Sequence, residues 1–510
     1  MDDKIIVSNR AALTAKYGTA GLARIKAAVD TLVAADKARG LNTRLVYLDD
    51  AVAMRRLRGR AVTNARSALQ NKQAIDAIYR ARSPEYLMIL GATDVVPHQD
   101  MGNSMYDGVN DPDRHAYGDL PYACDAPYSR DVAAFRGPTR VVGRLPDLTG
   151  AREPSYVLAV LGTAATYKTR LVGDYGGYFG LSTHSWRKST EQSLFNMFGN
   201  SAALTLAPPS GPAHPAARLA PLSHFINCHG GMADPTFYGE KGRSQPDALD
   251  SQALVGKIRP GTVAAVECCY GAELYDSVTL ALPLPICQQY LRQRAYGYFG
   301  SSTIAYGPAV GNGAADLITQ YFLLALLEGA SLGRAALLAR QRFVQQTAEL
   351  DPVDLKTLAQ FNLLGDPSVH PAKVASPTGL PKGVERFELQ RQQRNERRSK
   401  LRAMGEMLQD TKPTASRKTH VARKSPTVRK ALANIAREAG INSKAVFTPY
   451  KVSTPAGARA GAKAAGVASR YYVAVYRPRG KPGTVPGRSV AAVAKEVGGR
   501  IIGYRIYEEK

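Results

Sequence analysis

Short apolar runs alternate with longer amphipathic segments along the first 150 residues. The apolar runs predict strands over 4–9, 43–50, 85–97 and 139–147. The spacing of apolar residues between them predicts helices over 21–40 and 64–82. Strands that alternate with helices are typical of a parallel sheet with helices on its faces.

A second alternating unit follows the first. Its strands are predicted over 201–207, 224–228, 262–269 and 295–307. Its helices are predicted around 153–172, 188–198, 286–294, 313–328, 331–348 and 355–362. The Pro- and Gly-rich segment ASPTGLPKG, residues 375–383, is typical of a linker. We therefore expect one α/β half over 1–148 and a second over 149–372.

The chain beyond this linker differs from the rest in its charge. Residues 381–510 hold 29 Lys and Arg against 9 Asp and Glu, and so carry +20 of the formal net charge of +25. Within them, the dense charges of residues 385–409 predict either a solvated basic helix or a disordered stretch. We expect a basic linker and helix over 373–430 and a small basic α/β module over 431–510.

The last hundred residues show four further elements. A helix is predicted from Pro426 to Gly440, since Ser425 precedes it and apolar residues recur at helical spacing. Two strands, over 469–477 and 500–509, are predicted around a helix over 489–497.

Two neighbouring apolar runs of the second half end in reactive side chains. SHFINCHGG, residues 223–231, places His229 before two glycines, and GTVAAVECCYG, residues 261–271, ends in Cys268 and Cys269. Because the carboxyl ends of parallel strands meet at one edge of a sheet, we expect these side chains to lie close together.

A histidine beside a cysteine suits acyl transfer. The imidazole can take the proton of the thiol and later protonate a leaving amine. A glycine after the histidine lets a backbone N–H approach a developing oxyanion. Peptide hydrolysis is the commonest reaction of this kind.

These two blocks resemble the signature of caspase-like cysteine peptidases, with NCHGG as the His-Gly block and VECCYG as the acidic-x-Cys block. Four other segments resemble, in order, the gingipain family of that clan: YLMILGATDVVP, YGDLPYA, TRVVGRLPD and FNLLGDPSVHP. The resemblance covers residues 1–372. It implies two caspase-like parallel-sheet halves with helices on both faces, of which only the second carries the catalytic dyad.

The resemblance also implies roles for single residues. It places the catalytic histidine at His229 and the oxyanion donor at the backbone N–H of Gly230. Aligning Glu267 with the acidic residue of the block selects Cys269 as the nucleophile, whereas the Cys-x-x-Gly spacing of some relatives selects Cys268. The implied function is an intracellular cysteine endopeptidase that forms a covalent acyl-enzyme with a protein substrate and needs no cofactor or metal.

Other interpretations remain open. A lone histidine or a buried cysteine is often only part of a core. Cys228, His229, Cys268 and Cys269 could bind Zn²⁺, although the usual C-x₂-C or H-x₃-H spacing is missing. A Cys268–Cys269 redox pair is a further alternative. The rival function is a catalytically inactive peptidase-fold protein whose basic tail binds nucleic acid.

Candidate substrate-binding residues lie in two segments. The long loop over 101–131 contains four acidic residues that alone would be ordinary loop caps: Asp111, Asp113, Asp119 and Asp125. We select Asp119, in YGDLPYA, to orient His229 or to pair with a basic substrate side chain. By the resemblance, Ser301 and Ser302 line the pocket for the residue before the scissile bond; an ordinary strand and turn is the alternative.

Charge and cysteine content bear on partners and compartment. Basic residues interleaved with five tyrosines in 381–510 suit nucleic acid, through phosphate contacts and base stacking, and equally suit an acidic protein; the tyrosines are Tyr471, Tyr472, Tyr476, Tyr504 and Tyr507. No apolar run approaches the ~18 residues of a membrane span, so no membrane partner is expected. Five cysteines and an N-terminus without an apolar signal core predict a cytoplasmic protein.

Overall fold

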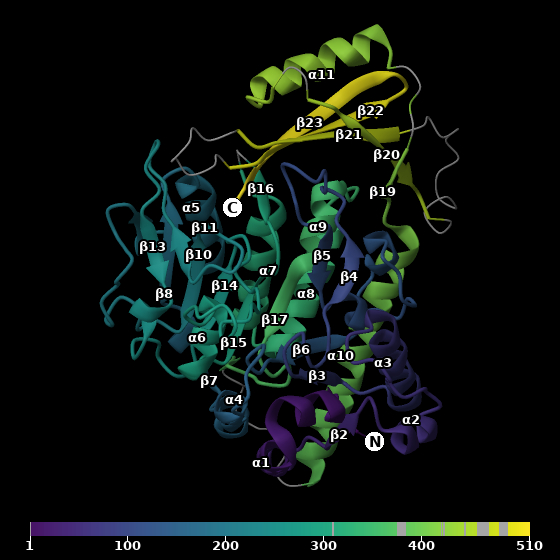
Figure 1. Cartoon of the computed structure of the whole chain (residues 1–510), viewed down its shortest axis with the longest axis vertical. Coiled ribbons are helices and arrows are strands. Elements are labelled where there is room, and N and C mark those ends of the chain that lie inside the picture. The colour runs from purple at the N-terminus through teal and green to yellow at the C-terminus, as the bar shows by residue number, and fades with distance from the viewer. Residues whose placement is uncertain are drawn as a thin grey trace.

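The computed structural model describes residues 2–308, 311–374, 384–419, 421, 424–442, 445–455, 469–478 and 488–510. A large sheet with flanking helices forms the body of the molecule, and a smaller sheet covered by a helix lies above it (Figure 1).

Ten strands form the central sheet in the order β2-β1-β3-β6-β17-β15-β14-β10-β8-β9. The first half supplies β1 (Lys4–Ser8), β2 (Thr43–Tyr47), β3 (Tyr86–Leu90) and β6 (Val141–Leu145). The second supplies β8 (Tyr178–Thr183), β9 (Leu204–Ala207), β10 (Ser223–Asn227), β14 (Val263–Val266), β15 (Gly297–Ser301) and β17 (Phe361–Leu364). Neighbouring strands within each half pair in parallel, except that β17 is antiparallel to β15.

Helices cover both faces of this sheet because successive side chains of a strand point to opposite faces. On β14, Ala264 and Val266 join one core, and Val263 and Ala265 join the other. The first core contains residues of α1 (Arg10–Ala38), α2 (Ala51–Arg56), α3 (Ala68–Arg82), α4 (Ser155–Thr166) and α6 (Ile286–Arg292). The second contains residues of α5 (Arg187–Phe198), α7 (Ala314–Leu327), α8 (Leu332–Gln346) and α9 (Pro352–Gln360).

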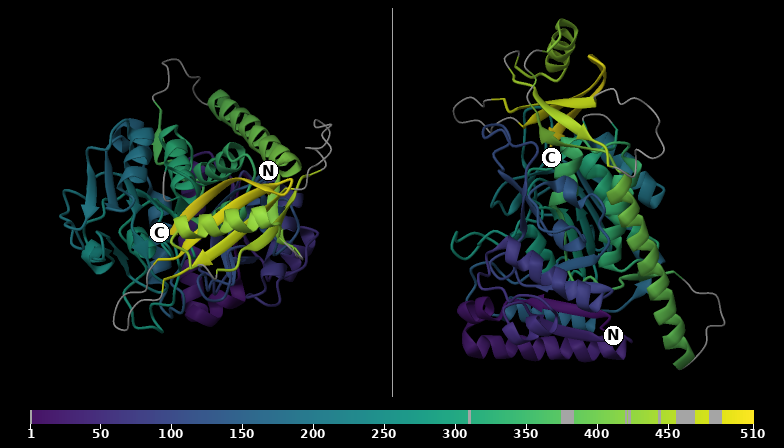
Figure 2. Two further views of the ribbon diagram at one scale, coloured as in Figure 1. Left: turned by 90° about the horizontal axis from the view of Figure 1, so that it is seen from above. Right: turned by 90° about the vertical axis from the view of Figure 1, so that its right-hand side faces the viewer.

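The smaller sheet joins the basic tail to the body. Its order is β16-β23-β22-β21-β20-β19, where β16 (Tyr306–Pro308) belongs to the body. The tail supplies β19 (Thr414–Lys418), β20 (Thr448–Ser453), β21 (Ser469–Tyr476), β22 (Val490–Val497) and β23 (Arg500–Glu509). Helix α11 (Pro426–Glu438) lies across this sheet, as the view from above shows (Figure 2). The predicted fold class, an α/β chain with parallel-stranded halves, helices on both faces and a smaller basic α/β unit, is confirmed.

The prediction of a helix over 489–497 is wrong, because these residues form β22. Ala492 and Ala494 of this strand pack beneath α11, whereas Ala491 and Val493 join the core of the body. Residues 490–494 are all apolar because both faces of the strand are covered, and such a run cannot be distinguished from a buried helix by its periodicity.

The remaining elements are one long helix and several short strands. Helix α10 (Val384–Thr411) contains the stretch 385–409 and runs along one side of the molecule (Figure 2). The short strands pair as β4 (Gln99–Gly102) with β5 (His115–Gly118), β7 (Arg170–Leu171) with β18 (Ala372–Lys373), and β12 (Thr236–Tyr238) with both β11 (His229–Gly230) and β13 (Asp247–Asp250). Within the ranges given above, no helix combines the length and the apolar character needed to cross a membrane.

The tail places most of its tyrosines away from solvent. Tyr471, Tyr472 and Tyr507 are buried, whereas Tyr504 is 44% exposed and donates a hydrogen bond from its hydroxyl to Glu438. Rings that are buried in the sheet are not available to stack on bases. The partner of residues 381–510, nucleic acid or an acidic protein, stays a prediction.

A buried ammonium connects the two halves of the body. Lys4 of β1 is fully buried and pairs with Asp36 at the end of α1, 2.9 Å away, and with Asp366 just after β17. Removing this cation would leave two buried carboxylates without their common partner, which is strongly destabilising.

We therefore expect Lys4→Met to lower the free energy of unfolding by about 3 kcal/mol or more. The matched control is Lys26→Met, which removes the exposed Lys26–Asp30 pair on α1 and should cost less than about 0.5 kcal/mol. Urea unfolding of the full chain measures both. Equal decreases in the free energy of unfolding for the two variants would contradict the role given to Lys4.

Candidate active site

The two reactive strand ends lie side by side. Strands β10 and β14 are paired in parallel, with Ile226 opposite Val266. The chain continues from β10 into His229 and Gly230, and from β14 into Glu267 and the cysteine pair. A Cβ atom on Gly230 would lie 2.0 Å from the carbonyl oxygen of Cys269, so only glycine lets these two segments approach so closely.

His229 is held by an acidic residue that the sequence interpretation missed. Its Nε2 lies 3.0 Å from Oε2 of Glu240, and its ring packs against Trp186 with the ring centroids 4.4 Å apart. Burial would raise the pKa of Glu240, but the hydrogen bond with His229 and the charge of Arg488 outweigh burial and lower it. An ionised Glu240 thus fixes the imidazole through Nε2 and does not engage Nδ1.

The two cysteines point into different surroundings. Cys268 belongs to the first of the two cores, and its Sγ accepts a hydrogen bond from the N–H of Cys228 at 3.3 Å. Cys269 belongs to the opposite core, and its Sγ accepts a hydrogen bond from the N–H of Ala305 at 3.2 Å. Burial raises the pKa of both thiols well above the usual range, so both are protonated in this arrangement.

The long loop of the first half reaches the segment behind Cys269. Asp113 accepts a hydrogen bond from the hydroxyl of Tyr270 and another from the N–H of Ile304, both at 2.8 Å. Asp111 accepts one from the hydroxyl of Tyr306 at 3.0 Å and pairs with the buried Lys356. These two aspartates therefore fix Tyr270, which follows Cys269, and the residues on either side of Ala305.

The predicted substrate-binding residues make internal contacts. Both carboxylate oxygens of Asp119 bind the buried guanidinium of Arg144, at 2.9 and 2.6 Å. The hydroxyl of Ser301 donates to backbone carbonyls of Cys268 and Thr303, and that of Ser302 to the carbonyl of Tyr117. The structure therefore does not bring Asp119 to His229, whose acidic partner is Glu240.

A cavity of about 460 Å³ opens beside the dyad. Its walls come from both halves and from the tail, and they include His229, Gly230, Tyr270, Ile304, Glu509 and Lys510. Lys510, one of these lining residues, accepts a hydrogen bond of 3.1 Å at its main-chain oxygen from the backbone N–H of Cys269. An N–H that binds a peptide oxygen in this position can also stabilise an oxyanion.

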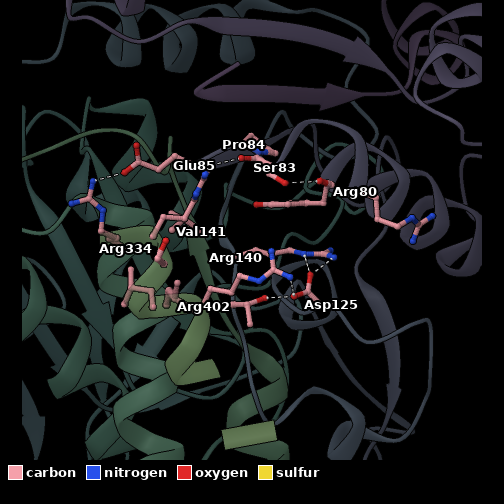
Figure 3. Close-up of a pocket in the computed structure, with 15 residues that line it drawn as sticks. Arg80, Ser83, Pro84, Glu85, Asp125, Arg140, Val141, Arg334 and Arg402 are labelled. Carbon is pink, nitrogen blue, oxygen red and sulfur yellow. Dashed lines mark hydrogen bonds and ion pairs between the residues drawn. The ribbon is translucent and has the colours of Figure 1, made fainter. Parts of the chain in front are cut away.

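A second cavity, of about 390 Å³, lies between α3, α8 and α10, away from His229 and Cys269 (Figure 3). It is rich in arginine, but its charges are largely paired internally: Arg140 binds Asp125 and Arg334 binds Glu85. Within the described ranges, no three His, Cys, Asp or Glu side chains are grouped to hold a metal ion. The dyad therefore remains the best candidate for chemistry.

A further hydrogen bond joins the segments that follow His229 and Cys269. Glu273, four residues after Cys269, accepts a hydrogen bond of 2.7 Å from the N–H of Ala233, four residues after His229. Burial, only partly offset by this hydrogen bond, raises the pKa of Glu273 to about 7. The carboxyl group thus changes its charge near neutral pH.

Neither a family model nor a curated protein matches this sequence. Among the solved structures that resemble it, one titled "Structure of Protease" covers 99% of this chain and 96% of its own, with a TM-score of 0.48 and 14% identity. A Saccharomyces cerevisiae separase–securin complex covers 57% of this chain and 17% of its own, with a TM-score of 0.29 and 12% identity. Because both TM-scores are below 0.5 and both identities are far below 25%, neither similarity establishes a function for this chain.

The raised pKa of Glu273 predicts a pH-dependent effect on stability. The folded state holds its proton up to about pH 7, whereas an unfolded glutamate loses it near 4.5. The stability contributed by this group is therefore present below the unfolded pKa and lost as pH rises through the folded one. Glu273→Gln keeps an acceptor for Ala233 but does not titrate, so its stability relative to wild type should rise by roughly 1–3 kcal/mol from pH 5 to pH 8.

Thermal unfolding at pH 5, 6, 7 and 8 measures this difference. Asp276→Asn is the control, because hydrogen bonds from Thr279 and Val278 outweigh burial and keep the pKa of Asp276 below its usual 3.8. The stability of Asp276→Asn relative to wild type should stay constant from pH 5 to pH 8. If the relative stability of Glu273→Gln is constant as well, the pKa of Glu273 is not raised in the folded state.

Proposed function

We propose that this chain is a cysteine endopeptidase in which Cys269 is the nucleophile, His229 the general acid and base, and Glu240 a positioning residue for the imidazole. The observation that carries the proposal is the hydrogen bond from the N–H of Cys269 to the main-chain oxygen of Lys510, which ends an extended segment and lines the same cleft as His229. A peptide carbonyl bound in this way is polarised by the nucleophile's own backbone.

The proposed reaction has two stages. His229 takes the proton of Cys269, the sulfur attacks the carbonyl carbon, and the N–H of Cys269 stabilises the resulting oxyanion. His229 then gives the proton to the leaving amine, the C–N bond breaks, and a thioester remains. Water, deprotonated by the same imidazole, attacks the thioester and releases the acid and the free thiol.

Close contact between the two strand ends supports this proposal over the alternative of an inactive binding protein. Gly230 lies directly against Cys269, and His229 keeps one ring nitrogen free of Glu240 for proton transfer. The five cysteines are free and buried, which fits a reducing compartment such as the cytoplasm. The backbone N–H of Gly230 is the second proposed oxyanion donor.

The two adjacent cysteines give a matched test of the nucleophile. Cys269→Ala should lower kcat/KM by at least about 100-fold, because the covalent route is lost. Cys268→Ala should keep kcat/KM within about threefold of wild type, although the small cavity it leaves costs about 1 kcal/mol of stability. A pool of fluorogenic peptides with every residue type before the scissile bond measures both. If hydrolysis is lost in Cys268→Ala and kept in Cys269→Ala, the nucleophile is Cys268.

A further inference from the structure

The last residues of the chain enter the cleft as an extended strand. β23 pairs antiparallel with β16, with Glu509 opposite Tyr306. Beyond the strand, the N–H of Lys510 donates to the carbonyl of Ala305 at 3.0 Å, and its own main-chain oxygen accepts a hydrogen bond from the N–H of Cys269. Figure 1 shows this end of the chain beside β16, within the outline of the molecule. Main-chain pairing with a strand edge is a common mode of peptide binding.

The side chain of Lys510 is fully buried among groups that attract a cation. Its Nζ lies 3.0 Å from Oδ1 of Asp316 and 3.4 Å from Oε2 of Glu267, and 4.6 Å from the ring centroid of Trp186. Burial, reinforced by the Asp316 carboxylate, raises the pKa of Glu267 well above its usual value. Two carboxyl groups so close together and out of water require a cation, or a proton, between them.

A glycine makes room for this side chain. A Cβ atom on Gly307 of β16 would lie 2.0 Å from Cε and 2.7 Å from Nζ of Lys510. Even a methyl group at this position would therefore overlap the lysine. The space is fitted to an unbranched chain with a compact ammonium, which favours lysine over the larger guanidinium of arginine.

The two residues before Lys510 are also held by specific partners. Arg477 binds both carboxylate oxygens of Glu509, at 2.6 and 2.7 Å. Arg488 binds Glu508 at 3.2 Å and also binds Glu240, the partner of His229, at 3.0 Å. The occupant of the cleft is therefore linked to the residue that orients the imidazole.

We propose that residues 508–510 are an internal, substrate-like occupant of the catalytic cleft, and that Lys510 fills a specificity pocket selective for lysine. This proposal rests on the proposed peptidase function. Glu267, Asp316 and Gly307 determine the specificity, and a substrate binds with a lysine immediately before its scissile bond. The internal segment competes with substrate and keeps Cys269 covered, which restrains the enzyme until the segment is displaced.

Freeing the pocket tests the proposal. Lys510→Ala should raise kcat/KM for fluorogenic peptides with lysine before the scissile bond by about tenfold or more, since an attached competitor acts at an effective concentration near millimolar. The same variant should prefer lysine over leucine there by about 100-fold or more. Adding Gly307→Ala should lower hydrolysis of the lysine peptides by at least about tenfold.

Matched controls separate these effects from general perturbation. Arg500→Ala removes one exposed positive charge from β23 and should leave kcat/KM for the lysine peptides at the wild-type value. Gly162 lies on α4 with open space around it, so Gly162→Ala should leave kcat/KM for these peptides unchanged in the Lys510→Ala background. If Lys510→Ala does not fold, Lys510→Met keeps the length of the side chain without its charge and takes its place.

Binding gives a readout that does not need catalysis. A fluorescein-labelled IYEEK peptide, the sequence of residues 506–510, should bind Lys510→Ala at least tenfold more tightly than wild type in fluorescence polarisation. If Lys510→Ala binds this peptide more tightly but neither this variant nor wild type hydrolyses the fluorogenic peptides, the peptidase function is wrong and the lysine pocket is supported. Hydrolysis that is equal in wild type and Lys510→Ala, without preference for lysine, would overturn the pocket and keep the peptidase.

Discussion

Strand β14 and the three residues after it determine where the chemistry can occur. The strand is buried on both faces, so its side chains alternate between two cores, and this alternation continues through Cys268 and Cys269. The same segment carries Glu267, which faces the ammonium of Lys510. A shift of one residue in the pairing of β14 with β10 would exchange the surroundings of both cysteines and move Glu267 away from the cleft.

The site is assembled from three distant parts of the chain. The second half supplies His229, Glu240 and Cys269; the loop of the first half supports the neighbouring residues through Asp111 and Asp113. The tail supplies Arg488, which contacts Glu240 and the occupant of the cleft alike. A basic tail with its own sheet is therefore also part of the candidate site, and it contacts the partner of His229 through the guanidinium of Arg488.

The sequence predicts the regular parts of this structure well. Apolar runs flanked by helical patterns locate most strands of the large sheet, and the strand ends point to His229 and the cysteine pair. Glu240 and Asp316 carry no such signal, because Glu240 lies in a long connection and Asp316 belongs to the first turn of α7. Their roles arise only from tertiary packing, as does that of Lys510. The acidic residue expected at the cleft, Asp119, is paired instead with Arg144, which no local pattern indicates.

Covalent capture tests the central claim most directly. A peptidyl acyloxymethyl ketone with lysine next to its reactive group should react with the full chain, and faster with the Lys510→Ala variant. Intact-mass measurement and peptide mapping should then show a single adduct on the sulfur of Cys269, lost in His229→Ala. An adduct on Cys268, or no adduct on either cysteine in both forms, would contradict a cysteine peptidase built on Cys269 and His229.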